Sequence, residues 1–103
     1  MTTKRILVVD DERAIREAMV RVLVDAGYLV AAADSMGQAL ALEGPWDAMV
    51  LDERLPDGSG HDIALVFPDV PVVTVSGYSH ATLAKPFTNE ALVEAVAALW
   101  GTA

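Results

Sequence analysis

The chain has 103 residues, 53% of them hydrophobic and 21% charged, and this length and composition suit one globular domain. Its formal net charge of −8 argues against nucleic acid and anionic membranes as direct partners, because both require clustered lysine and arginine. The absence of cysteine excludes disulfides and thiolate sites, and no apolar run approaches the ~18 residues of a membrane span, so a cytoplasmic location is expected.

Strands and helices are predicted to alternate along the chain. Short apolar runs mark the strands, and capping residues, glycines and prolines bound the helices. In order, the sequence predicts a strand at 6–9, a helix at 12–26, a strand at 29–32, a helix from Asp34 or Ser35 to Leu42, a strand at 48–51, a loop at 55–60, a helix at 61–67, strands at 70–75 and 82–84, and a helix from Thr88 or Asn89 to Trp100. This alternation indicates parallel βαβ units, in which ligands lie outside the carboxyl ends of the strands.

Polar residues directly follow four of the predicted strands. Asp10 and Asp11 follow the first strand, Asp52 the third, Ser76 the fourth and Lys85 the fifth. Taken singly, an aspartate pair is typical of a helix N-terminus, and a lone aspartate or serine is typical of a turn. Taken together and in this order, the five residues predict a site at one edge of the sheet.

The residue types in this set suit phosphoryl transfer. Three carboxylates in a small space repel one another unless a cation neutralises them, and Mg²⁺ prefers oxygen ligands. Asp52 stands alone at the end of its strand and is the predicted nucleophile, which would attack phosphorus and form an acyl phosphate. Lys85 would pair with one phosphoryl oxygen, and the Ser76 hydroxyl would donate to another.

In its motifs the chain resembles the receiver domains of two-component response regulators. The matching segments are 6–12 (ILVVDDE), 50–60 (VLDERLPDGSG), 72–77 (VVTVSG) and 85–87 (KPF), within a resemblance that covers about residues 4–100. The resemblance implies an α/β, flavodoxin-like, doubly wound sheet of five parallel strands in the order 2-1-3-4-5. It implies a single receiver domain over residues 1–103 with no output domain, and no enzyme activity beyond its own phosphorylation and dephosphorylation.

The resemblance also assigns a phosphorelay function and a metal site. Asp52 would accept a phosphoryl group from a histidine of a sensor kinase or of a histidine phosphotransfer protein, and the output would be altered protein–protein binding. Asp11 would bind Mg²⁺ directly and Asp10 largely through water. Asp52 and the backbone carbonyl of Arg54 would complete the protein ligands.

Four further residues match positions that contact the phosphoryl group or control its lifetime. Ser76 and Lys85 match the hydroxyl and the lysine that contact phosphoryl oxygens. Arg54, two positions after the acceptor, and Tyr78, two positions after the hydroxyl, resemble the side chains that tune acyl-phosphate lifetime.

The connection between the fourth and fifth predicted strands departs from the family. Only residues 77–84 separate Ser76 from Lys85, whereas a helical crossover needs ~12 residues or more. The sequence therefore predicts that the helix between these strands is missing. An extended parallel crossover, an antiparallel hairpin and exchange of the fifth strand between two chains remain open, and the segment 85–87 favours the first. The uncovered sheet predicts a partner protein or a homodimer through the fourth strand, the fifth strand and the last helix.

Two other functions are compatible with this fold. A receiver-like interaction module without phosphorylation is favoured by the missing helix and opposed by the intact set of polar site residues. An aspartyl-phosphate phosphatase acting on small molecules is disfavoured, because Arg54 stands where such enzymes commonly carry a second aspartate. A test of Mg²⁺ binding discriminates the interaction module from a phosphoacceptor. A test for turnover of phosphate esters discriminates the phosphatase.

Overall fold

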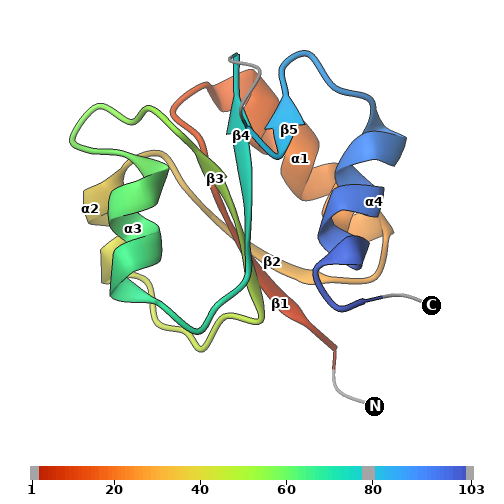
Figure 1. Cartoon of the computed structure of the whole chain (residues 1–103), viewed down its shortest axis with the longest axis horizontal. Helices are drawn as coiled ribbons and strands as arrows, with labels where there is room; N and C mark the ends of the chain where they lie inside the picture. The colour runs from red at the N-terminus through yellow and green to blue at the C-terminus, as the bar shows by residue number, and fades with distance from the viewer. Residues whose placement is uncertain (1–2, 78–80, 102–103) are drawn as a thin grey trace.

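Five parallel strands form the centre of the molecule, with α2 and α3 on one face and α1 and α4 on the other (Figure 1). The computed structural model describes residues 3–77 and 81–101. In chain order the elements are β1 (Arg5–Val9), α1 (Arg13–Asp25), β2 (Leu29–Ala33), α2 (Met36–Ala41), β3 (Ala48–Asp52), α3 (Gly60–Val66), β4 (Val72–Ser76), β5 (Leu83–Ala84) and α4 (Asn89–Ala98). The strand order is β2-β1-β3-β4-β5, and all neighbouring strands are parallel, which confirms the predicted fold class.

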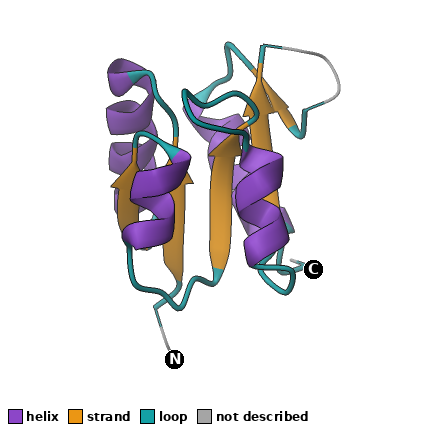
Figure 2. Cartoon of the chain, turned by 90° about the vertical axis from the view of Figure 1, so that its left-hand side faces the viewer, coloured by secondary structure: helices purple, strands orange, loops and turns teal. Residues whose placement is uncertain are grey.

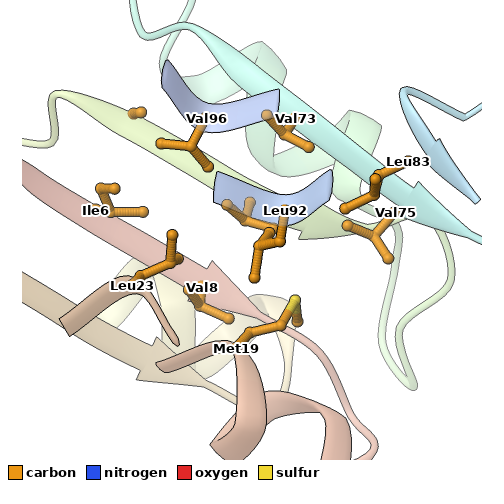
Figure 3. Close-up of a cluster of buried hydrophobic side chains, with 11 residues drawn as sticks. Ile6, Val8, Met19, Leu23, Val73, Val75, Leu83, Leu92 and Val96 are labelled. Carbon is orange, nitrogen blue, oxygen red and sulfur yellow. The ribbon is translucent and has the colours of Figure 1, made fainter. Parts of the chain in front are cut away.

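The sheet separates two hydrophobic clusters because successive side chains of a strand point to opposite faces. Ile6 and Val8 of β1 join the cluster beneath α1 and α4, whereas Leu7 and Val9 join the cluster beneath α2 and α3. Figure 3 shows the first cluster, which is built around Ile6, Val8, Met19, Leu23, Val73, Val75, Leu83, Leu92 and Val96. Burial of each such side chain contributes roughly 1.5–3 kcal/mol to folding, so both faces of the sheet are held in place by their helices.

Hydroxyl caps set the starts of three helices. The side chains of Ser35, Ser59 and Thr88 each accept a hydrogen bond from a backbone N–H in the first turn of α2, α3 and α4, respectively. The cap at Ser59 starts α3 at Gly60, one residue before the predicted start. Gly27 follows α1 with a φ of 102°, the left-handed conformation that a C-terminal glycine adopts at low cost.

The connection from β4 to β5 is short and keeps the strands parallel. None of the residues described between them, Gly77, Ala81 and Thr82, is helical, in agreement with the predicted loss of that helix. Leu83, the first residue of β5, pairs with Val75, which is one residue before the end of β4. The connection therefore does not have to run back to the start of β4 before the parallel pairing begins. The Thr82 N–H then donates to Thr74 Oγ1 at 2.9 Å, and this side-chain contact replaces the next step of the ladder.

Both tryptophans lie at the end of the molecule where β3 begins. Trp46 is buried in the cluster beneath α2 and α3, with the Arg5 guanidinium 5.1 Å from its ring. Trp100 follows α4, with its ring 5.7 Å from Tyr28 and 4.9 Å from the Lys4 ammonium. Within residues 3–77 and 81–101, no helix has the length and apolarity needed to cross a membrane.

Candidate functional site

The carboxyl ends of four strands bring polar residues to one edge of the sheet, the end to which the arrows point in Figure 2. Asp10 follows β1, Asp52 ends β3, Ser76 ends β4 and Lys85 follows β5. A pocket of about 320 Å³ opens here. It is lined by Asp11, Glu12, Asp52, Arg54, Ser76, Gly77 and Lys85.

Four carboxylates gather around this pocket. Asp10, Asp11, Glu12 and Asp52 each offer one oxygen, and these oxygens all lie within 4.8 Å of one another. Asp10 is fully buried and Asp52 is only 7% exposed, whereas Asp11 and Glu12 are exposed. Negative charges at this spacing repel one another, so the cluster favours a cation.

The Lys85 ammonium is the cation that the chain itself places there. Its Nζ lies 3.1 Å from Asp10 Oδ2, 3.1 Å from Glu12 Oε1 and 3.5 Å from Asp52 Oδ2. Burial by itself would lower the pKa of Lys85, but the contacts with Asp10 and Glu12 outweigh burial and raise that pKa. Lys85 therefore remains charged at neutral pH.

Asp52 has the electrostatic surroundings of a nucleophile. Burial, reinforced by the charge of Asp10, raises the pKa of the Asp52 carboxyl. Lys85 and the Arg54 N–H, which is 3.5 Å from Asp52 Oδ1, oppose the rise. A carboxylate that has lost water and gained basicity is suited to attack an electrophile.

The loop that follows β3 is fixed at two points. The Asp57 carboxylate accepts hydrogen bonds from the Met36 and Gly37 N–H groups of α2, both at 2.8 Å. At Gly60, an added Cβ would lie 2.5 Å from the carbonyl oxygen of the last residue of β3, so α3 packs directly onto the strand end. Arg54, between the end of β3 and the tethered Asp57, lines the pocket.

The donor set fits a divalent cation. Asp10 Oδ2 is buried and, apart from its ion pair with Lys85, accepts no hydrogen bond from residues 3–77 and 81–101. The four clustered side chains all offer carboxylate oxygens, and Asp11 is open to solvent. This combination suits Mg²⁺, which takes oxygen ligands and keeps several waters.

The chain matches the family model of the response regulator receiver domain over residues 6–97. The chain belongs to this family. Receiver domains are signalling domains of two-component systems, in which they interact with histidine kinases or phosphotransfer proteins. Receiver domains bind Mg²⁺ at an acidic cluster, and in this chain Asp10, Asp11, Glu12 and Asp52 gather at the corresponding edge of the sheet.

Similar proteins include regulators and isolated receiver domains. The transcriptional regulatory protein CusR of Escherichia coli (strain K12) is 39% identical over 61 residues, which cover 57% of this receiver domain and 27% of CusR. The structure of response regulator TrrA of Thermotoga maritima, in complex with Mg(2+)-BeF, is 32% identical with a TM-score of 0.84, over 94% of this chain and 99% of that chain. The CheY-like receiver domain protein of Methanospirillum hungatei JF-1 is 27% identical with a TM-score of 0.84, over 93% and 92% of the two chains.

The structure places most of the predicted site residues of this receiver domain together. Those found around the pocket are Asp10, Asp11, Asp52, Arg54, Ser76 and Lys85. Tyr78, predicted to tune the acyl-phosphate lifetime, lies outside the described residues. The roles assigned to all seven residues stay predictions.

Glu12 is a site residue to which the sequence analysis gave no role. It occupies the N-cap position of α1, where sequence reasoning expects a helix cap. Its contact with Lys85 joins residues 73 positions apart. The third acidic residue in a row after β1 was the only sequence feature that could have indicated it.

An apolar groove of the receiver domain adjoins the pocket. It lies between α1 and α4, measures about 480 Å³, and is lined among others by Ile15, Val22 and Phe87. Glu12 and Lys85 line both the groove and the pocket, so this ion pair forms the wall between them.

Proposed function

We propose that this receiver domain accepts a phosphoryl group on Asp52 from a phosphohistidine of a sensor histidine kinase or of a histidine phosphotransfer protein. The observation that carries this proposal is the Lys85 ammonium 3.5 Å from Asp52 Oδ2, inside a cluster of four carboxylates. Phosphoryl transfer requires of a protein an acceptor group, a fixed positive charge and carboxylates that can bind a divalent cation. Phosphorylation then alters which proteins the domain binds.

The transfer exchanges one bond to phosphorus for another. An Asp52 carboxylate oxygen forms a bond to phosphorus, and the phosphorus–nitrogen bond of the donor breaks, with its electron pair going to the histidine ring. Lys85 pairs with one phosphoryl oxygen and the Ser76 hydroxyl donates to another, which spreads the developing negative charge. The domain thus promotes only its own phosphorylation and, with water as acceptor, its own dephosphorylation.

The acidic cluster is the proposed Mg²⁺ site. Asp11 would hold the ion directly and Asp10 largely through water, and Asp52 and the Arg54 carbonyl would complete the protein ligands. When bound, Mg²⁺ supplies charge neutralisation for the phosphoryl oxygens. The buried and otherwise unbonded Asp10 Oδ2 supports this assignment.

Arg54 and Tyr78 are the proposed controls of acyl-phosphate lifetime. Arg54 is exposed at the rim of the pocket, where its side chain can shield or admit the hydrolytic water. Tyr78 is proposed for the same role from its sequence position alone. Substitution of either residue by alanine should change the hydrolysis rate of the acyl phosphate more than the rate of its formation.

The groove between α1 and α4 is the proposed contact for the phosphoryl donor. It is mainly apolar and borders Lys85, so a donor helix seated there would hold its histidine beside the pocket. The net charge of −8 opposes nucleic acid or an anionic membrane as a direct partner. We place the protein in the cytoplasm, with residues 1–103 forming one receiver domain.

A second copy is the proposed cover for the sheet near β5. Only two residues of β5 pair with β4, and Thr82 and Ala84 are exposed there. The homodimer would form through β4, β5 and α4. Sedimentation velocity over a wide concentration range tests it, and a monomer at the highest concentration, with and without beryllofluoride, would contradict it.

Intact mass after incubation with acetyl phosphate and Mg²⁺ tests the proposed phosphorylation. Wild type should gain one phosphoryl group, and chelation of Mg²⁺ should abolish the gain. Asp52→Asn removes the acceptor and should stay unmodified. Asp62→Asn, an exposed aspartate in the first turn of α3, is the matched control and should be modified like wild type.

The result also separates the competing functions. No adduct on a folded wild-type protein would contradict the proposal and favour an interaction module that works without phosphorylation. An adduct that persists in Asp52→Asn would place the acceptor elsewhere. Steady turnover of phosphate esters would indicate a phosphatase.

A further inference from the structure

Glu12 occupies a helix cap but does not act as one. In α2, α3 and α4 the N-cap side chains of Ser35, Ser59 and Thr88 each accept a backbone N–H hydrogen bond. Glu12, at the N-cap of α1, makes no side-chain cap hydrogen bond. Glutamate is not a preferred N-cap residue, so this side chain can make a contact outside α1.

The Glu12 carboxylate is turned toward Lys85 instead. Glu12 Oε1 lies 3.1 Å from Lys85 Nζ, closer than Asp52 Oδ2 at 3.5 Å. Asp10 and Asp52 are buried, whereas the Glu12 side chain is 58% exposed at the outer wall of the pocket. Lys85 is therefore held from the outer side by Glu12 and from the inner side by two buried carboxylates.

We propose that Glu12 is a positioning residue that competes with the phosphoryl group for Lys85 and so weakens phosphoryl binding at Asp52. The inference rests on the proposed function, since it names a control of the same site. It assigns to Glu12 neither a direct metal contact nor a contact with the phosphoryl group. Glu12 acts through Lys85 alone.

The competition follows from what each carboxylate can contact. Asp10 and Asp52, which contact Lys85, also belong to the carboxylate cluster that would hold a divalent cation. A cation bound beside them would repel the ammonium, and Glu12, on the outer side, would be left to hold Lys85. A phosphoryl group at Asp52 must then draw Lys85 from Glu12, and breaking that ion pair opposes binding.

The size of the effect is that of a largely solvated ion pair. Such pairs stabilise by a few tenths to about one kilocalorie per mole, which corresponds to roughly a two- to fivefold change in a binding constant. Glu12→Gln should therefore bind the phosphoryl analogue beryllofluoride about two- to fivefold more tightly than wild type at saturating Mg²⁺. Its initial rate of phosphorylation by acetyl phosphate should rise by a similar factor.

Two further variants separate the Lys85 contact from charge in general. Glu17→Gln removes the same charge from α1 at a residue that pairs with Arg13 on the surface, and its beryllofluoride affinity should equal that of wild type. Glu12→Asp keeps the charge and shortens the side chain by one methylene, which withdraws it from Lys85. Aspartate is also a good helix cap, so this variant should fold and should bind beryllofluoride as tightly as Glu12→Gln.

The experiment measures Mg²⁺ affinity by calorimetry and beryllofluoride affinity by the amide resonance of Gly77, which lines the pocket. Mg²⁺ affinity should differ by less than about threefold between wild type and Glu12→Gln. A loss above tenfold would make Glu12 a metal ligand and overturn the inference, as would unchanged or weaker beryllofluoride binding in Glu12→Gln. If wild type binds neither Mg²⁺ nor beryllofluoride, the proposed function itself fails, and the inference fails with it.

Discussion

Asp52 carries a charge that its surroundings oppose when no divalent cation is bound. Its folded-state pKa is raised by burial and by the neighbouring Asp10 charge, so the fold favours the protonated form. Such a group stabilises the fold below its unfolded pKa, and this contribution is lost as the pH rises through the folded pKa. At neutral pH the charged Asp52 therefore destabilises the domain.

Asp52→Asn should accordingly raise the melting temperature of the Mg²⁺-free protein at pH 7. A rise of a few degrees is expected, since 1 kcal/mol shifts the midpoint of a domain of this size by roughly 4–8 °C. Calorimetry at pH 7 and at pH 4 measures it, and the difference between the two proteins should shrink at the lower pH, where Asp52 takes up a proton. A variant that melts below wild type at pH 7 would show that Lys85 already satisfies the Asp52 charge.

Sequence spacing could locate the strand-end residues but not the direction of every side chain. Asp52 and Ser76 each follow an apolar run, and because parallel strands end at one edge, their proximity could be predicted. A role for Glu12 could not be predicted in this way, because its contact depends on where Lys85 lies at the end of β5. The sequence predicted Glu12 as the first residue of a helix, and local rules for a helix start do not predict the contact with Lys85.

At the scale of elements, α3 depends on a glycine at its first residue. A Cβ on Gly60 would lie 2.5 Å from the Asp52 carbonyl oxygen and 2.9 Å from Leu51 Cβ, and neither neighbour is the tip of a flexible side chain. Gly60→Ala should cost about 1–3 kcal/mol of unfolding free energy, which chemical denaturation measures. Gly77→Ala is the control, because no atom of residues 3–75 and 81–101 lies within 4 Å of its added Cβ, and its stability should match wild type.

The tether between α2 and the loop after β3 should depend on pH. The N–H groups of Gly37 and Met36 lower the pKa of the Asp57 carboxyl. Asp57 therefore stabilises the fold at pH values above its unfolded pKa of about 3.9. This contribution is lost as the pH falls through the lower folded pKa. The amide proton shifts of Met36 and Gly37 should titrate together, with a midpoint below about 3.9. Asp57→Asn should abolish that titration, and its persistence in the variant would assign it to another carboxyl.

The β4–β5 connection shows how far chain length can predict a path. Eight residues exclude a helix, and the parallel path and the absence of that helix agree with the sequence prediction. Chain length alone does not show where along β4 the fifth strand pairs. The structure needs little chain, since β5 pairs only with Val75 and Ser76 and a threonine pair continues the contact.

At the scale of the whole molecule, the chain has a net charge of −8, and four of its carboxylates gather in the acidic cluster at the pocket. Mg²⁺ that binds the folded state alone should stabilise it by about 2.7 kcal/mol at a hundredfold excess over its dissociation constant. Thermal melts in Mg²⁺ and in NaCl of equal ionic strength separate site binding from general screening. Asp11→Asn should lose most of the rise in melting temperature that Mg²⁺ causes and keep the rise that NaCl causes. Equal rises from both salts in wild type would contradict a specific Mg²⁺ site.

The placement of the two tryptophans has an optical consequence. Trp46 precedes β3 and Asp52 ends it, so the two residues lie at opposite ends of a five-residue strand that is roughly 17 Å long at ~3.3 Å per residue. Trp100 follows α4 and packs on Tyr28, just before the start of β2 and likewise remote from the pocket. Tryptophan fluorescence should therefore change on denaturation but not on phosphorylation of Asp52 or cation binding in the pocket. The same emission band can then report whether the fold is intact while the acceptor is modified.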